Sequence, residues 1–211
     1  LPKKASNNVT PLDYNKNRNY RILIGCENHK VYNYDVKGSK VNGWEYSPTS
    51  SSANGNIWHF TLAKKDYIVI PLENGKVKIV QRNGKDRIKL KNKLLNSSNP
   101  VVLKIGTELS KTYLLSSDTT ALVQKLFLND NIEEFRFSDI ELNSKVSFLD
   151  YDNNNSLDFA FYYKDDLTIS NSDKSILYEN TFDQEISHQP QHFIIPNQSS
   201  KTGVITKNKI Y

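Results

Sequence analysis

The sequence predicts an all-β protein made of repeated antiparallel units, and three observations carry this prediction. Apolar residues recur at every second position in segments such as 76–80 (KVKIV) and 87–90 (RIKL), which is the period of a β-strand. Turn-forming residues bound these segments. A similar pair of segments then returns about every 45 residues along the chain.

The repeated feature is a hairpin of two strands. Residues 20–24 lead through a polar turn to 31–32, and residues 66–70 lead in the same way to 77–78. Further copies begin near 112, 157 and 202, and another strand precedes each hairpin. We expect a fourth strand after the first four hairpins, at 41–46, 86–90, 132–137 and 175–179. Residues 119–128 (TTALVQKLFL) also fit a helix, but their place in the repeat favours a strand.

One hairpin has a specific turn signal. Asn83-Gly84 lies between two alternating segments, which predicts a tight type I′ turn with positive φ at both residues.

Four strands in about 45 residues are typical of a β-propeller blade, because a lone four-stranded sheet needs neighbours to bury its faces. The expected architecture is a propeller-like array of four complete blades and part of a fifth, a fragment of a larger propeller. After an N-terminal tail (1–9), one domain (10–211) holds blades at about 10–47, 57–92, 100–138 and 145–182, and a partial blade at 190–211. Two packed β-sandwiches are the alternative, but they do not explain the repeat.

Composition narrows the function classes. The 211 residues carry 28 Lys and Arg against 23 Asp and Glu, and the densest basic cluster, 85–93, contains no aromatic residue for base stacking. We therefore expect no nucleic-acid partner. No run of 18 apolar residues is present, so no membrane span is expected. The single cysteine, Cys26, excludes an internal disulfide and is expected to be a buried small apolar residue.

Residues 31–46 (VYNYDVKGSKVNGWEY) place an apolar pair, Asp35, a turn at Gly38 and Trp44 in order. This segment resembles quinoprotein-like (PQQ-type) and WD40-like propeller blades. The resemblance implies that Trp44 docks one blade on the next, and we expect it to be mostly buried. Nothing resembles the quinone-binding residues of that family, so no organic cofactor is expected.

Residues 150–158 (DYDNNNSLD) resemble the D-x-D-x-[DN]-G-x-x-D calcium loop of FG-GAP and VCBS-type propeller repeats. Ca²⁺ prefers six to eight oxygen ligands. Side chains of Asp150, Asp152 and Asn154, the carbonyl of Ser156 and the carboxylate of Asp158 are the expected ligands. Asn155 stands where the motif has glycine. A plain turn is the alternative, because Asn and Asp side chains bond their own backbone.

The sequence offers no catalytic motif, and no catalytic residue is expected. His59 and His192 each precede Phe in the first strand of a blade, and we expect each to be a hydrogen-bonded structural residue; lining a central channel is the alternative.

The sequence therefore favours a non-catalytic platform that binds a protein or a small ligand. We expect it to belong to a larger bacterial protein of the periplasm, the cell surface or the extracellular space. The alternatives are part of a propeller enzyme whose catalytic residues lie elsewhere, and a calcium-dependent, adhesin-like structural repeat.

Overall fold

Strands dominate the secondary structure, as the period-two pattern predicts. The structure is a computed structural model of the 211-residue chain and describes residues 1–193 and 201–211. Within these residues there are five antiparallel sheets of two to four strands and one short 3-10 helix, η1 (Leu109–Lys111). The same residues include no helix long and apolar enough to cross a lipid bilayer.

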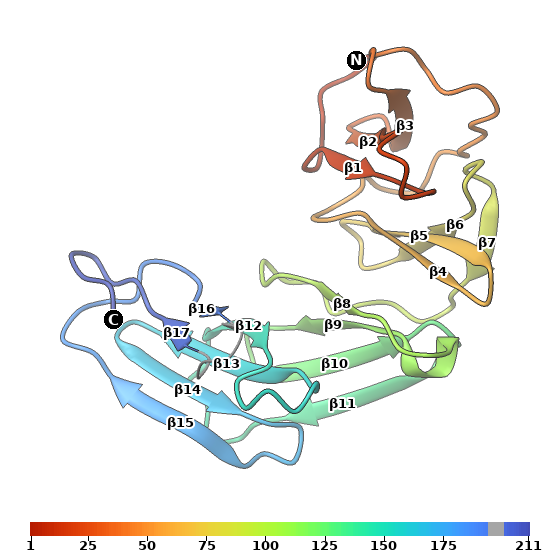
Figure 1. Cartoon of the computed structure of the whole chain (residues 1–211). Helices are drawn as coiled ribbons and strands as arrows, with labels where there is room; N and C mark the ends of the chain where they lie inside the picture. Colours follow the sequence, from red (N-terminus) through yellow and green to blue (C-terminus); the bar gives the residue numbers. More distant parts are fainter. Residues whose placement is uncertain (194–200) are drawn as a thin grey trace. The chain divides into compact units, whose positions relative to one another are not determined.

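The sheets follow one another in chain order (Figure 1). The first sheet consists of β1 (Thr10–Leu12), β2 (Arg21–Cys26) and β3 (Lys30–Asp35). The second consists of β4 (Trp58–Leu62), β5 (Lys65–Pro71), β6 (Val77–Val80) and β7 (Asp86–Lys89). The third consists of β8 (Val102–Lys104), β9 (Tyr113–Ser117), β10 (Leu122–Phe127) and β11 (Ile132–Arg136).

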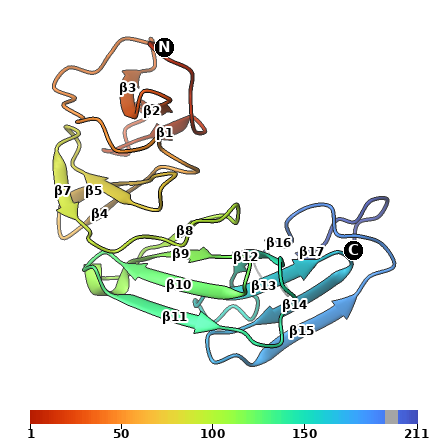
Figure 2. The same ribbon diagram turned by 180° about the vertical axis from the view of Figure 1, so that it is seen from behind.

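The fourth sheet consists of β12 (Lys145–Leu149), β13 (Asp158–Tyr163), β14 (Asp166–Ser170) and β15 (Ile176–Thr181), and the last of β16 (Gln191–Phe193) and β17 (Lys201–Gly203). The strands β12 to β15 pair in sequence order and run side by side in both views (Figure 2). In every four-stranded sheet each strand pairs with its neighbours in sequence, as in a propeller blade. The predicted strand within 119–128 is confirmed as β10.

Contacts divide the chain into two compact units. The first comprises 1–96, 103–115 and 125–133, and the second comprises 97–102, 116–124 and 134–211. The division runs through the third sheet, so we describe each unit by itself. The prediction of one domain over 10–211 stays a prediction.

The core of the first unit lies where the first two sheets bury their apolar positions. Leu23, Ile68 and Ile70 are fully buried in it, and Trp44 packs against this cluster with part of its surface exposed. Cys26 is also fully buried, as expected, and burial raises the pKa of its thiol. Most of the surface of Trp44 is buried, as expected, and its ring packs on the core.

The fourth strand expected at 41–46 does not form. The carbonyl of Val31, which a fourth strand would use, accepts the indole N–H of Trp44 at 2.7 Å. Gly43 adopts a φ of +77°, which turns the chain. The backbone N–H of Glu45 then donates to the carbonyl of Asn83 in the second sheet at 2.7 Å. The segment therefore begins on β3, where the N–H of Val41 donates to the carbonyl of Asn33 at 2.9 Å, and then leaves it for the second sheet before a fourth strand can form.

The turn at Asn83-Gly84 and several other hairpin turns share one geometry, which differs from the predicted type I′. Of Asn83 and Gly84, only Gly84 has a positive φ, at +82°. Its N–H donates to the carbonyl of Gln81, and the N–H of Gln81 donates to the carbonyl of Lys85, both at 2.9 Å. This is a type I turn followed by one left-handed residue.

The same pair of backbone hydrogen bonds closes other turns, with Gly75, Asp130 and Lys174 in the left-handed position. Two adjacent residues with positive φ, as type I′ requires, occur instead at Ala63 and Lys64 between β4 and β5.

The predicted N-terminal tail is not free of the fold. The N–H of Ser6 donates to the carbonyl of Gly25 at 2.9 Å, and the N–H of Glu27 donates to the carbonyl of Lys4 at 3.0 Å. This segment therefore runs along the end of β2.

Candidate functional site

The acidic loop 150–158 joins β12 to β13 in the second unit. Leu149, the last residue of β12, pairs directly with Asp158, the first residue of β13. This register brings the two ends of the loop together. Asn153 and Asn155 have φ angles of 59° and 66°, so Asn155 adopts the left-handed conformation that the motif's glycine would supply.

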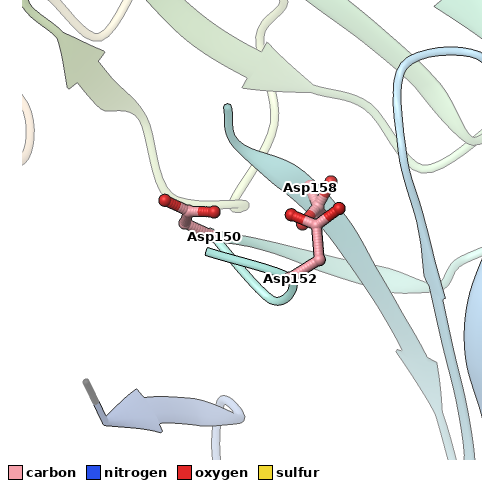
Figure 3. A group of neighbouring side chains, drawn as sticks. All are labelled: Asp150, Asp152 and Asp158. Atoms are coloured by element: carbon pink, nitrogen blue, oxygen red, sulfur yellow. The ribbon is translucent and has the colours of Figure 1, made fainter. Parts of the chain in front are cut away.

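Three of the predicted ligands come together in this loop. Ligand oxygens of Asp150, Asp152 and Asp158 all lie within 4.8 Å of one another (Figure 3). The side chains therefore converge rather than diverge into solvent, which is the arrangement that a metal loop requires.

Two carboxylate oxygens in this group are buried and lack a partner among the described residues. Asp158 is only 1% exposed; its Oδ2 accepts the N–H of Tyr151 at 2.9 Å, but its Oδ1 accepts nothing from the described part of the chain. Asp150 behaves alike: Oδ2 accepts the N–H of Asn155 at 3.0 Å, and Oδ1 is buried without a described partner. A buried unpaired carboxylate oxygen is costly, so these atoms require an explanation.

The remaining predicted ligands take part in bonds within the loop. Asp152 accepts the backbone N–H of Asn154 at 3.2 Å and its side-chain amide at 2.9 Å. The side-chain oxygen of Asn154 accepts the N–H of Ser156 at 2.7 Å. These bonds shape the loop, and ligation by Asn154 and by the carbonyl of Ser156 stays a prediction.

The electrostatics of the loop disfavour three bare charges. Burial raises the pKa of Asp158, and the neighbouring carboxylates of Asp152 and Asp150 raise it further, while the N–H of Tyr151 lowers it. A cation placed among the three side chains would remove this repulsion. Hard carboxylate oxygens in a flexible loop are ligands that suit Ca²⁺.

The two histidines singled out from the sequence are both hydrogen-bonded within their own hairpins. The Nε2 atom of His59 lies 2.7 Å from Oδ1 of Asp66, and Nδ1 of His192 lies 2.8 Å from Oγ1 of Thr202. Asp66 also receives the guanidinium of Arg82 at 2.7 Å. Both histidines are therefore hydrogen-bonded, as expected.

Sequence reasoning missed one feature of the second unit, a cavity of about 340 Å³ lined by residues between 151 and 211. His192 was noted, but the aromatic residues around it are spread over 60 positions and share no local pattern. No signal in the sequence alone would have grouped them.

The folds of solved proteins match this arrangement. The structure titled BBS1N in complex with ARL6DN is similar with a TM-score of 0.61 and 10% identity, and the match covers 100% of this chain and 65% of that chain. The computationally designed Ika8 protein is similar with a TM-score of 0.53 and 11% identity, covering 96% of this chain and 69% of that one. No family model matches the sequence, and no curated protein does.

The class that the sheets and these similarities define is an all-β, β-propeller-like protein. The chain spans about two thirds of the BBS1N chain that it matches, and at these identities the likeness concerns the fold alone.

Proposed function

We propose that this chain is a non-catalytic, β-propeller-like interaction module whose acidic loop holds a structural Ca²⁺. The observation that carries the proposal is the buried Oδ1 of Asp158, which has no partner among the described residues and belongs to a carboxylate beside those of Asp150 and Asp152. This convergence of three carboxylates supports the proposal that the resemblance in sequence to FG-GAP and VCBS calcium loops suggests.

Calcium suits the loop better than magnesium on general grounds. Ca²⁺ accepts variable geometry and a mixture of carboxylate, amide and carbonyl oxygens, whereas Mg²⁺ requires near-octahedral geometry and retains several waters. Asp150, Asp152 and Asp158 supply charge, and Asn154 and Ser156 supply neutral oxygens. Extracellular calcium modules bind with dissociation constants of about 0.1–1 mM, and a periplasmic or cell-surface location, which we propose for this protein, predicts an affinity in the same range.

The experiment is a thermal melt with and without Ca²⁺. With a Kd of about 0.1–1 mM, about 10 mM Ca²⁺ is a ten- to hundredfold excess, at which a ligand that binds only the folded state stabilises it by about 1.4–2.7 kcal/mol. Ca²⁺ at this concentration should therefore raise the melting temperature of the second unit, and Mg²⁺ should raise it less. Asp152→Asn should remove the rise. The matched control is Asp173→Asn, which changes an exposed aspartate in the β14–β15 turn and should leave the rise intact.

The metal-free protein gives a second test, because the effect of Asp152→Asn on stability should reverse when Ca²⁺ is absent. Without Ca²⁺, Asp152→Asn removes one of three mutually repelling charges and should leave stability equal or higher. With Ca²⁺, the same variant should be less stable than the parent chain. A variant that is equally destabilising in both conditions, or a melting temperature that Ca²⁺ does not move, would show that the loop is only a turn.

The interaction role has separate support. The sequence contains no catalytic motif, and the BBS1N chain of similar fold was crystallised in complex with ARL6DN. We extend protein binding to this chain as part of the proposal, within a larger exported bacterial protein. An adhesin-like calcium-dependent repeat is the second candidate, and the acidic loop is the observation that favours it.

A photo-crosslinking residue tests for a protein partner. Phe193 in the second unit is 54% exposed, so a photoreactive group at this position can reach a bound partner. Replacing Phe193 by benzoylphenylalanine in the native host should give one discrete adduct. The control replaces Val36, which is 61% exposed in a turn of the first unit. Absence of an adduct at Phe193, or the same diffuse adducts at both positions, would contradict a partner on this surface.

A further inference from the structure

The sequence contains four Asn-Gly dipeptides, all in the first unit, and their glycines share one backbone conformation. The φ angles of Gly43, Gly55, Gly75 and Gly84 are +77°, +72°, +78° and +82°. Asn-Gly is the dipeptide that loses its asparagine amide most readily, because a glycine without Cβ leaves its backbone nitrogen open to the preceding side chain. The four pairs therefore form a matched series whose members differ in their surroundings.

Hydrogen bonds hold both reacting groups in the pairs Asn74-Gly75 and Asn83-Gly84. The N–H of each glycine donates to the backbone carbonyl three residues earlier at 2.9 Å. The side-chain oxygens of Asn74 and Asn83 accept the N–H two residues further on, at 3.2 and 3.1 Å. Both glycines are also buried. These two turns therefore restrain the glycine nitrogen and the asparagine amide alike.

The pairs Asn42-Gly43 and Asn54-Gly55 lack these restraints. All four residues are exposed. Within residues 1–193 and 201–211, neither glycine N–H and neither asparagine side chain has a hydrogen-bond partner. A Cβ placed on Gly43 or Gly55 would meet nothing within 4 Å, whereas one on Gly75 would lie 2.6 Å from a backbone oxygen. Water and hydroxide therefore have free access to these two pairs.

We propose that Asn42 and Asn54 are sites of spontaneous deamidation, whereas Asn74 and Asn83 keep their amides. The glycine nitrogen loses its proton to hydroxide and attacks Cγ of the asparagine. The new N–Cγ bond forms, the Cγ–Nδ2 bond breaks, and the departing nitrogen takes a proton from water, which releases ammonia and restores the hydroxide. Water then adds to either carbonyl of the succinimide ring and opens it to aspartate or isoaspartate. One water is consumed and one ammonia is released, and nothing is oxidised or reduced.

The hydrogen bonds of the restrained turns decide the difference in rate. An N–H that donates to a carbonyl must give up that bond before its nitrogen can attack. A hydrogen bond that has to break first slows a reaction by about two- to tenfold. The bonds to the glycine N–H and to the asparagine side chain together amount to roughly four- to hundredfold in each restrained turn.

Conversion of Asn42 acts on the contacts that hold Trp44 on the first sheet. On one side of Asn42, the N–H of Val41 donates to the carbonyl of Asn33 at 2.9 Å. On the other side, the indole of Trp44 donates to the carbonyl of Val31 at 2.7 Å. Isoaspartate adds a methylene to the backbone between these two contacts, so the indole should lose its position on β3. Each conversion also adds one negative charge to the unit.

Timed incubation of the full chain in mildly alkaline buffer, followed by peptide mapping in a mass spectrometer, measures the four rates separately. The same incubation in urea gives the rates in the unfolded chain, and the ratio of unfolded to folded rate removes the effect of neighbouring residues. This ratio should be about one at Asn42 and Asn54 and roughly four- to hundredfold at Asn74 and Asn83. Equal ratios at all four positions, or faster loss in the folded chain at Asn74 or Asn83, would overturn the proposal.

Two reciprocal variants complete the test. Asn42→Gln keeps an amide but needs a larger ring to cyclise, so it should stop the loss at position 42 and leave the rate at Asn54 unchanged. Tryptophan emission should change during incubation of the parent chain and of Asn54→Gln, and stay constant in Asn42→Gln. Emission that changes equally in all three chains would contradict the effect on Trp44. The readouts require neither calcium nor a partner, so this proposal and the proposed function fail separately.

Discussion

Gly84 should tolerate a side chain less well than Gly38, which has a similar backbone conformation but open space around it. Its φ is +82°, and a Cβ at this position would lie 3.0 Å from the backbone nitrogen of Tyr46 and 3.1 Å from Cδ2 of Trp44. Both neighbours belong to the segment that follows β3. Gly84→Ala therefore strains the turn and also pushes apart the packing between the first and second sheets.

Gly38 provides the matched control, because it has a φ of +80° and nothing within 4 Å of the corresponding Cβ. The left-handed conformation costs an L-residue about 1–2 kcal/mol at either position. Overpacking a tight contact adds about 1–3 kcal/mol. Gly38→Ala should thus destabilise the first unit by about 1–2 kcal/mol, and Gly84→Ala by about 2–5 kcal/mol. Gly84→Val should cost more than Gly84→Ala, because branching at Cβ resists positive φ.

Urea unfolding followed by tryptophan emission measures this difference. Both tryptophans, Trp44 and Trp58, lie in the first unit, so the emission reports on that unit. The slope with urea should stay constant while the midpoint falls. If Gly84→Ala lowers the midpoint no more than Gly38→Ala does, then the indole of Trp44 does not rest on this turn and the packing argument is wrong.

Three further predictions concern the same unit. Trp44→Phe removes the indole hydrogen bond to the carbonyl of Val31 and should cost about 1 kcal/mol in the same urea assay; an unchanged midpoint would contradict the role of that bond. Burial acts to raise the pKa of Asp66, but hydrogen bonds from His59 and Arg82 outweigh it and hold the pKa below its ordinary value. This stabilisation is present above the unfolded pKa and is lost as the pH falls through the lower folded value. Asp66→Asn should therefore destabilise the chain at pH 7 and lose its effect in acid, as a series of melts at different pH would show. Burial raises the pKa of Tyr14 to about 12. Its contribution to stability is complete below pH 10 and falls between pH 10 and 12, as the unfolded phenol ionises first; Tyr14→Phe should make the alkaline loss of stability smaller, and an identical loss would refute the shift.

The sequence was most informative where local chemistry decides the structure. Alternating apolar residues and polar turns located the hairpins, because the period of two and the presence of turn-forming residues are both local properties, although the type of the turn at Asn83-Gly84 was predicted wrongly. The segment 41–46 shows the limit. It has strand-like residues, but a side chain, Trp44, competes for the backbone acceptor on β3, and Glu45 bonds to the next sheet. Such competition depends on tertiary contacts that no local pattern contains.

The convergence of the acidic loop could be predicted, like the hairpins, because it depends on residues that are close in sequence. Its carboxylates are close in sequence, and strand pairing between Leu149 and Asp158 closes the loop, so the convergence follows from the register. The aromatic cavity, by contrast, is built from residues that are distant in sequence. Its residues come from the acidic loop, β14, β15, β16, β17 and the segments beyond the last strands, and they meet only because the second unit folds.

Tyr151 belongs to both features. Its backbone N–H donates to Asp158 at 2.9 Å, and its ring lines the cavity beside His192. A cation that holds the carboxylate of Asp158 should therefore also restrict Tyr151 and be felt in the cavity. Ca²⁺ should shift the imidazole ¹⁵N signal of His192 and leave that of His188, an exposed residue outside the cavity. Tyr151→Ala removes the ring that contacts His192 and should abolish the shift while Asp150, Asp152 and Asp158 still bind the ion. A His192 signal that Ca²⁺ does not move would show that the loop and the cavity are independent.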